Sequence, residues 1–425
     1  MVPAASRAPY LALAHRDYRR LIASQLLSLT GTQMQVVAIN WHVYLLTKSP
    51  LALGFVGLTR VVPIVIFSLW GGVVADRHDR RRVMIVTQIA MTAVALGLAA
   101  ITFARRETLG LLYLLNALGA AAVAFDGPSR QALIPRLVPP EDLPGALSLN
   151  LSVFQAALIG GPALAGIFIA RAGPGTRGLS TIYLLNALSF LAVIFALATM
   201  RTSGAPEPAA GKVQMGSALA EGLRFVFKTP LMVWTMGLDF LATFFAGAMS
   251  LLPIFADQVL RVGARGYGIL AAAPAVGALA GALFLSVRPL PERQGRIFLW
   301  AVAAYGGSTI VFGLSRSFWL TLAALAGVGL ADAISTIIRQ TIRQFITPDR
   351  LRGRMTSINM IFFMGGPQLG ELEAGLVASL FATTVAGVTV SVVSGGILTI
   401  LITAAIAAAA PMVREYDFRQ TDRPT

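Results

Sequence analysis

The sequence predicts an all-α membrane protein of twelve transmembrane helices, arranged as two pseudo-symmetric halves of six. Three observations support this prediction: the composition, the spacing of apolar runs and an internal repeat. Of the 425 residues, 56% are hydrophobic and 12% are charged, and the mean hydropathy is +0.74. Soluble domains carry about 25% charged residues. A soluble chain of this length could not bury so much apolar surface, so most of it must face lipid.

Apolar runs of membrane-spanning length follow one another along the chain. A transmembrane helix needs about 20 mostly apolar residues. The runs are 20–46, 52–75, 83–104, 110–134, 144–170, 179–200, 230–256, 266–287, 296–314, 317–340, 355–382 and 386–411. If the N-terminus is cytoplasmic, 25 of the 34 Lys and Arg residues lie in inner loops and tails and 8 in outer loops, with Arg60 inside a span. This excess predicts that both termini are cytoplasmic.

A polar stretch, 201–229, separates the sixth and seventh runs. It begins with a flexible Ser, Gly and Pro composition, and 217–228 has the pattern of a basic amphipathic helix lying on the inner membrane face. The predicted parts are a cytoplasmic segment 1–19, a six-helix bundle 20–200, this linker 201–229, a second bundle 230–412 and a cytoplasmic tail 413–425.

The two halves repeat each other. The block 130–139 aligns with 339–348 at an offset of 209, and Asn150 pairs with Asn359 at the same offset. Asp126 precedes the first block and Asp332 precedes the second. A duplicated six-helix unit around a central pathway is the architecture of many secondary transporters.

A dense charged turn, 72–82, joins the second and third runs and must lie at a membrane surface. Its acidic Asp76 is surrounded by arginines, which can donate charge-assisted hydrogen bonds to it. The turn resembles the loop between helices 2 and 3 of the major facilitator superfamily, whose pattern is Gly-x-x-x-Asp-Arg-x-Gly-Arg-Arg. The matching residues are Gly72, Asp76, Arg77, Arg80 and Arg81, and Asp79 stands where that family usually has glycine.

Other segments resemble one branch of this superfamily, the bacterial exporters that include the enterobactin exporter and macrolide efflux proteins. The segments that carry this resemblance are 71–81, 125–131, 252–257 and 267–281. The resemblance implies the major facilitator fold and a secondary transporter of the bacterial cytoplasmic membrane. It would export lipophilic or amphipathic small molecules (a drug, macrolide or siderophore) by alternating access, as a proton-coupled antiporter.

Two alternatives stay open: an uptake carrier of the same fold, and a non-transporting receptor or scaffold. The run 160–166 partly resembles the fifth-helix Gly-Pro signature of exporters, although Ala157 stands where glycine is usual. Proton antiporters of the superfamily often carry an arginine in the fourth helix, and 114–119 has none. Proton coupling therefore has less support than transport.

The chemistry of the chain argues against an enzyme. It has no cysteine, which excludes disulfides and thiolate metal sites, and it lacks the HExxH, GxSxG and GxxxxGK[ST] motifs. We expect no cofactor, with a proton gradient as the driving force. The expected partners are a small-molecule substrate and the lipid bilayer, with no nucleic acid, and a monomer suffices.

Gating is assigned to charged residues near the inner face. Asp126 and Arg130 are four residues apart, so they pair locally or with the loop arginines, and Asp332 resembles Asp126 by symmetry. We expect Asp76, with Arg77, Arg80 and Arg81, to latch the outward-open state on the inner face, against Asp126 and the start of the eleventh helix. The full set is Gly72, Asp76, Arg77, Arg80, Arg81, Asp126, Arg130, Asp332 and Arg339.

Charges within spans are the candidates for proton coupling, because a charge in a membrane needs a partner or water. These are Asp239, Glu371, Glu373 and Arg60. Glu371 and Glu373 point about 200° apart on a helix, so one is expected to line the pathway or titrate while the other packs at an interface. Either glutamate is a candidate partner for Arg60.

Amides and aromatic rings within spans are candidates for the substrate cavity. They are Gln33, Trp41, Asn116, Phe240, Asn359 and Gln368. The amides could instead hydrogen-bond to neighbouring helices, and aromatic rings near helix ends could mark the membrane interface.

Overall fold

The computed structural model describes residues 9–173, 175–204, 221, 224–286, 293–348 and 351–417. Within these ranges the side chains at 69, 72, 73, 75–77, 352–354, 356–358, 360, 361, 363 and 364 lie outside the description. The secondary structure of the described residues consists entirely of helices. Two compact units are present. The N-terminal unit is Met1–Thr47 with Thr59–Ala210, and the C-terminal unit is Lys48–Leu58 with Gly211–Thr425.

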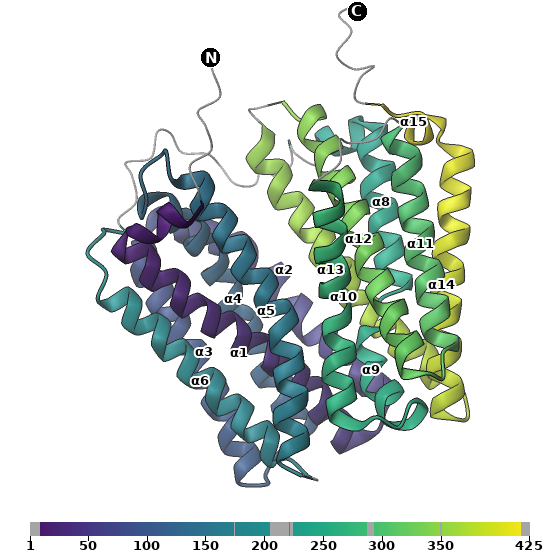
Figure 1. Ribbon diagram of the computed structural model, residues 1–425, viewed down its shortest axis with the longest axis horizontal. Coiled ribbons are helices and arrows are strands. Elements are labelled where there is room, and N and C mark those ends of the chain that lie inside the picture. Colours follow the sequence, from purple (N-terminus) through teal and green to yellow (C-terminus); the bar gives the residue numbers. More distant parts are fainter. Residues whose placement is uncertain are drawn as a thin grey trace, which may run out of the picture. The chain divides into compact units, whose positions relative to one another are not determined.

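Among the described residues, twelve long helices account for the twelve predicted runs (Figure 1). The first six are α1 (Arg16–Thr47), α2 (Pro50–Arg77), α3 (Arg80–Phe103), α4 (Leu109–Leu133), α5 (Leu143–Arg171) and α6 (Arg177–Ala198). The second six are α8 (Pro230–Phe245), α10 (Gly263–Ser286), α11 (Gln294–Leu314), α12 (Phe318–Ile346), α13 (Arg352–Ser379) and α14 (Thr384–Ala409). The prediction of an all-α membrane fold is confirmed.

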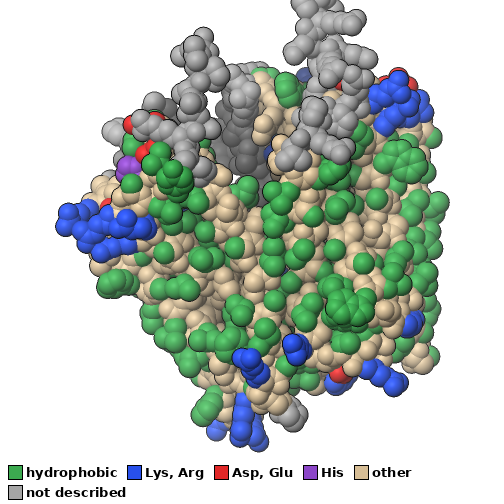
Figure 2. Space-filling view, viewed as in Figure 1, with side chains coloured by type: hydrophobic (Ala, Val, Ile, Leu, Met, Phe, Trp, Pro, Cys, Tyr) green, Lys and Arg blue, Asp and Glu red, His purple; other side chains and the backbone are tan. Residues whose placement is uncertain are grey.

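Ten of the described segments are long and apolar enough to cross a membrane by length and composition. The two long helices outside this set are α13, many of whose side chains lie outside the description, and α1, which carries more polar side chains. In α1 these include Gln25, Gln33, Gln35 and Asn40. Figure 2 shows hydrophobic side chains over the broad surface, with most visible Lys and Arg side chains toward its margins. This distribution suits helices that stand in lipid with charged ends in water.

In the N-terminal unit, α1 packs against α5 and α6, and α3 packs against α4 and α6. The start of α1 is tied to the segment that follows α6. Asp17 accepts hydrogen bonds from Thr202 Oγ1 (2.8 Å), Thr202 N (2.9 Å) and Arg201 N (2.9 Å). Burial alone would raise the pKa of Asp17, but these hydrogen bonds and the nearby Arg16 lower it below its usual value.

In the C-terminal unit, α10 packs on α12, α11 on α12 and α14, and α8 on α13 and α14. Glycines allow the closest of these crossings. A Cβ atom at Gly277 of α10 would overlap the backbone of Ala326 in α12, and one at Gly329 of α12 would overlap Pro274 in α10. Such close approach of backbones is common where helices pack in membranes.

The seventh predicted run, 230–256, is not one continuous helix. After α8 the chain forms a 3-10 turn (Ala248–Leu251), a single α-turn α9 (Leu252–Ile254) and a π-turn (Phe255–Val259). The helix breaks at Gly247, where a Cβ atom would lie 3.1 Å from Gly370 of α13. Non-helical backbone at membrane depth is tolerated where protein buries it, and Ser250, Leu251 and Phe255 are buried.

The end of the linker and the first turns of α2 complete the C-terminal unit. The described part of the predicted amphipathic helix, 224–228, is helical, and Val226 packs with Met232 and Met355. Residues 48–58 belong to this unit rather than to the first bundle. Gly54 would place a Cβ atom 3.1 Å from Leu372 of α13, so the start of α2 lies directly on α13.

Candidate functional site

The charged turn between α2 and α3 is organised by Asp79. Its Oδ1 accepts hydrogen bonds from Arg81 N (2.9 Å) and Arg82 N (3.2 Å), so it caps the N-terminus of α3. This explains why an aspartate stands where the superfamily usually has glycine.

Two arginines of the turn bind the C-terminal ends of other helices in the same unit. Arg80 Nη1 donates to Ala132 O (3.2 Å), and Arg81 donates to Met200 O (2.9 Å) and Ala198 O (2.8 Å). Unpaired carbonyls and the negative end of the helix dipole favour such cations. The turn therefore holds α4 and α6 in place. The side chains of Gly72, Asp76 and Arg77 lie outside the description, so the predicted latch by Asp76 stays a prediction.

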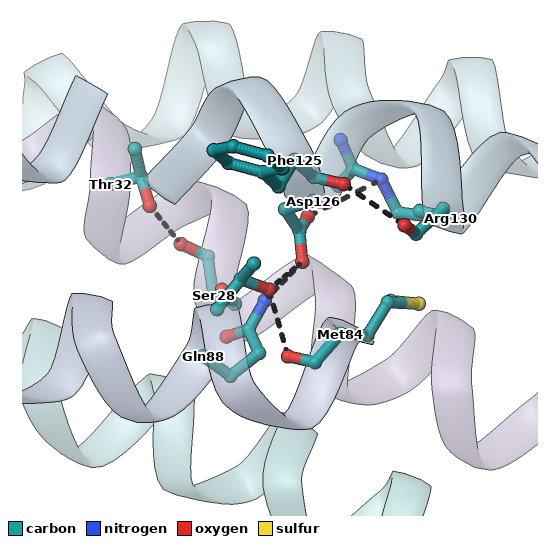
Figure 3. Close-up of polar contacts among 9 residues, drawn as sticks. Ser28, Thr32, Met84, Gln88, Phe125, Asp126 and Arg130 are labelled. Atoms are coloured by element: carbon teal, nitrogen blue, oxygen red, sulfur yellow. Dashed lines mark hydrogen bonds and ion pairs between the residues drawn. The ribbon is translucent and has the colours of Figure 1, made fainter. Parts of the chain in front are cut away.

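The carboxylate of Asp126 is held by hydrogen bonds and an ion pair with other residues of the N-terminal unit (Figure 3). Its Oδ1 accepts hydrogen bonds from Gln88 Nε2 (3.0 Å) and Thr87 Oγ1 (3.2 Å), and its Oδ2 lies 4.0 Å from Arg130 Nε. The side chain of Asp126 reaches from α4 toward Gln88 of α3, with Arg130 one turn along α4. Local pairing with Arg130, one of the two expected arrangements, is present. No sequence pattern predicts the two α3 donors, because only packing brings α3 beside α4.

The C-terminal unit contains a buried ion pair between α8 and α12. Arg339 Nη1 contacts Asp239 Oδ1, and the two residues are only 5% and 8% exposed. Arg339 Nη2 also donates to Thr336 Oγ1 (3.1 Å), and the Thr336 side chain is hydrogen-bonded to Asp332. Asp332, Thr336 and Arg339 lie along one face of α12 at spacings of four and three residues.

A small pocket adjoins this ion pair and has room for about one water molecule. Its lining residues are Asp239, Ala242 and Thr243 of α8, Val302 and Tyr305 of α11, and Asp332 and Ser335 of α12. The pocket is too small for organic cargo but suits a proton or a water that carries one.

The repeat singles out Asp332 and Arg339 but does not predict their partners. By symmetry, Asp332 was expected to resemble Asp126, which pairs locally or with the loop arginines. In the structure Asp332 is hydrogen-bonded to Thr336 of its own helix, and Arg339 binds Asp239 of α8. Two predicted gating residues and one predicted coupling residue thus meet in one cluster.

Two other coupling candidates, Glu371 and Glu373, lie on α13, and the fourth, Arg60, lies on α2. A Cβ atom at Gly57 would be 2.7 Å from Glu371 Oε2, so Glu371 lies against the start of α2. Glu373 is half-buried. The predicted partnership of Arg60 with either glutamate joins the two units and stays a prediction.

The candidate cavity residues have varied surroundings. Asn116 Nδ2 donates to Thr59 Oγ1 (2.9 Å), and Gln33 packs against Gly161 of α5. The Asn116 hydrogen bond matches the alternative in which amides join neighbouring helices, whereas the Gln33 contact is made by its Cβ atom. Trp41 is 6% exposed and its ring lies 5.4 Å from that of Tyr44.

In the C-terminal unit, the half-buried Phe240 ring stacks on Phe244 with ring centroids 6.1 Å apart. It meets the Phe362 ring edge-on, with ring centroids 6.0 Å apart. Gln368 is buried and Asn359 is half-buried. Substrate contact by all six cavity candidates stays a prediction.

One buried polar cluster was missed by sequence reasoning. His42 Nδ1 lies 3.1 Å from Tyr183 Oη, and His42 Nε2 lies 4.0 Å from Glu107 Oε1. The one available signal was that the chain has only three histidines and one of them, His42, falls inside an apolar run.

Comparison with known proteins agrees with this architecture. The family model described as transmembrane secretion effector matches residues 7–422. The chain is 26% identical over 397 residues to the multidrug efflux pump Tap of Mycolicibacterium fortuitum, covering 91% of this chain and 94% of Tap. It is 24% identical over 361 residues to the enterobactin exporter EntS of Shigella boydii, covering 85% of each.

Solved transporter structures share the fold. A bacterial homologue of the human lysosomal transporter Spinster, in an inward-facing and unoccupied conformation, superposes with a TM-score of 0.73 at 17% identity, covering 96% of this chain and 99% of that one. The nucleoside transporter NupG superposes with a TM-score of 0.71 at 13% identity, covering 93% and 99%. With a family match across nearly its whole length, the chain belongs to the transmembrane secretion effector family and is a multi-pass transporter of the major facilitator superfamily, not an enzyme.

Proposed function

We propose that this transporter exports lipophilic or amphipathic small molecules across the bacterial cytoplasmic membrane by alternating access, in exchange for protons. It acts as a monomer with both termini in the cytoplasm. Export is supported by the relatives, since Tap is named a multidrug efflux pump and EntS an enterobactin exporter. The orientation is supported by the excess of Lys and Arg in the inner loops.

The observation that carries proton coupling is the charge count in the buried cluster of the C-terminal unit. Two carboxylates, Asp239 and Asp332, lie beside one guanidinium, that of Arg339. An unpaired charge at this depth is costly, so the surplus negative charge favours binding of one proton. The pocket that Asp239 and Asp332 line has room for the water molecule that would deliver it.

A proton at this cluster can be coupled to helix movement because the two carboxylates lie on different helices. With Asp239 ionised, its ion pair with Arg339 ties α8 to α12. When a proton binds Asp239, Arg339 loses that partner and shifts toward Asp332 on its own helix, a path already bridged by Thr336. The link between α8 and α12 is then released, and it reforms when the proton leaves.

Uptake by the same fold is the competing function. Accumulation of a panel of labelled lipophilic compounds, measured in cells with and without the protein and repeated with a protonophore, separates the two. Export coupled to protons predicts lower accumulation with the protein and loss of that difference with the protonophore. Higher accumulation would establish uptake instead, and no difference for any compound would refute transport of this cargo class.

The role of the cluster is tested in everted membrane vesicles with an imposed pH gradient. We expect Asp239→Asn and Asp332→Asn each to abolish gradient-driven transport while protein remains in the membrane. The matched control is Glu415→Gln, which neutralises an exposed carboxylate. Unchanged transport in both aspartate variants would rule out this cluster as the coupling site.

A further inference from the structure

Beyond the coupling cluster, the N-terminal unit holds a second buried group of titratable side chains. His42 lies five residues before the end of α1 and is 0% exposed, although imidazole is polar. Its ring is nearly parallel to that of Tyr183 in α6, with centroids 6.1 Å apart. Glu107 approaches from the loop between α3 and α4, and its side chain is 10% exposed.

The hydrogen bonding around His42 is incomplete. Nδ1 is 3.1 Å from Tyr183 Oη, but Nε2 has no hydrogen-bond partner among the described residues, and neither has the buried Oε2 of Glu107. At 4.0 Å, Nε2 and Glu107 Oε1 are too far apart for a hydrogen bond. Leaving a buried polar atom unpaired costs about 1–3 kcal/mol, so such a gap calls for an explanation.

The surroundings of His42 match a protonated imidazole. A neutral ring has one donor and one acceptor nitrogen, whereas a protonated ring has two donors. Two groups that can accept a hydrogen bond face those nitrogens, namely the Tyr183 hydroxyl and the Glu107 carboxylate. The other charged side chains at this end of the unit are exposed: Arg105, Arg106, Arg171 and Arg177.

We infer that His42, Glu107 and Tyr183 form a proton-binding site at the end of the N-terminal unit opposite the start of α1. A proton added to Nε2 bonds to Glu107 and shortens the 4.0 Å separation to about 2.8 Å, the usual length of such a charge-assisted bond. The loop that carries Glu107 is short, between Phe103 and Leu109, so this movement pulls the loop onto α1.

This site responds to the medium at the outer face, and that placement rests on the orientation in the proposed function. The site is separate from Asp239 and Asp332, which lie in the other unit. It therefore makes the outer ends of α1, α3, α4 and α6 sensitive to external pH without carrying the transported proton.

The chain has no cysteine, so one introduced cysteine reports on the loop. The probe is an environment-sensitive maleimide dye on Arg106→Cys, an exposed position next to Glu107. The purified full chain is titrated from about pH 4 to pH 8, which brackets the ordinary histidine range. We expect a fluorescence step that His42→Gln and Glu107→Gln each remove. The matched control, His15→Gln, changes the half-exposed histidine that pairs with Asp142 and should keep the step.

A step that persists in both His42→Gln and Glu107→Gln, or the absence of any step in the parent, would overturn this site. The readout needs no cargo or gradient, so it holds or fails independently of export. Labelling of Arg106→Cys in intact cells by a membrane-impermeant maleimide tests the orientation, and no labelling would overturn the outer placement. Glu107→Gln leaves His42 in place, so a folding failure of one variant does not remove the test.

Discussion

Removing Arg339 alone is predicted to destabilise the C-terminal unit strongly. The substitution Arg339→Met deletes the cation that Asp239 contacts and that Thr336 links to Asp332. Two carboxylates then remain in one buried pocket without a counter-charge. Breaking a buried pair by removing one partner costs about 3–5 kcal/mol. Coulomb's law gives a similar magnitude: two unit charges 4 Å apart at an effective dielectric constant of 20 interact by about 4 kcal/mol, which lies within that range.

Removing both partners is predicted to cost far less. In the double variant Asp239→Leu with Arg339→Met, apolar side chains replace the ion pair, and such replacements are often neutral. Asp332 keeps its hydrogen bond with Thr336. The double variant should therefore recover about 2 kcal/mol or more relative to Arg339→Met, a coupling within the range for residues in contact. The matched control is Arg343→Met, which removes a half-buried arginine one turn farther along α12 and should leave the unfolding free energy close to that of the parent.

The assay is equilibrium unfolding in mixed detergent and SDS micelles, followed by the fluorescence of the five tryptophans. The predicted order of unfolding free energy places the parent and Arg343→Met highest, the double variant next and Arg339→Met lowest. The reasoning is refuted if Arg339→Met unfolds like the parent, or if the double variant is no more stable than Arg339→Met. Either result would mean that the ion pair does not hold α8 to α12.

Three other predictions concern stability. Arg81→Met should lower the free energy of unfolding by about 1.5–3 kcal/mol, because Arg81 is charged and binds two helix-end carbonyls. The control is Arg82→Met, which changes an exposed side chain and should lower it little. Unfolding in SDS compares the two variants. Gly277→Ala forces a methyl group into the backbone of α12 and should lower the free energy of unfolding by at least about 1–3 kcal/mol. Gly307 has open space around it, so Gly307→Ala should be tolerated and raise the free energy of unfolding by up to about 1 kcal/mol. Equal melting temperatures of the two variants would contradict this prediction. The pKa of Asp17 is lower in the folded state than in the unfolded state, so ionised Asp17 stabilises the fold at pH values above the unfolded-state pKa. This contribution is lost as the pH falls through the folded-state pKa. The difference in unfolding free energy between the parent and Asp17→Asn should therefore shrink to zero on acidification.

The number and type of helices followed from the sequence because lipid imposes a local rule. Each span must satisfy its own backbone and present about 20 apolar residues, so a window of that length is enough to find it. The broken seventh span shows where this rule stops. The run 230–256 is mostly apolar and long enough for one span, yet α8 ends at Phe245. The break lies at Gly247, whose close approach to Gly370 depends on how α8 crosses α13.

The residues of the candidate site were identifiable for a related reason. A charge inside an apolar run is conspicuous, so Asp239, Asp332 and Arg339 could be selected without a structure. Their partners could not, because the repeat indicates only that Asp332 resembles Asp126, and pairing with a local residue or with the loop arginines stayed open. In the N-terminal unit Asp126 does lie near Arg130, but in the C-terminal unit Arg339 binds Asp239 of another helix.

By itself, the sequence determined the all-helical membrane fold, the duplicated plan and the positions of its intramembrane charges. Each of these is a property of a short window or of a comparison between windows. Only the tertiary structure decided which charge meets which, that Asp79 caps α3, and that His42 faces Glu107. The physical reason is that hydrophobic length is set along one helix, whereas an ion pair or hydrogen bond depends on the rotation and crossing of two helices, which packing alone determines.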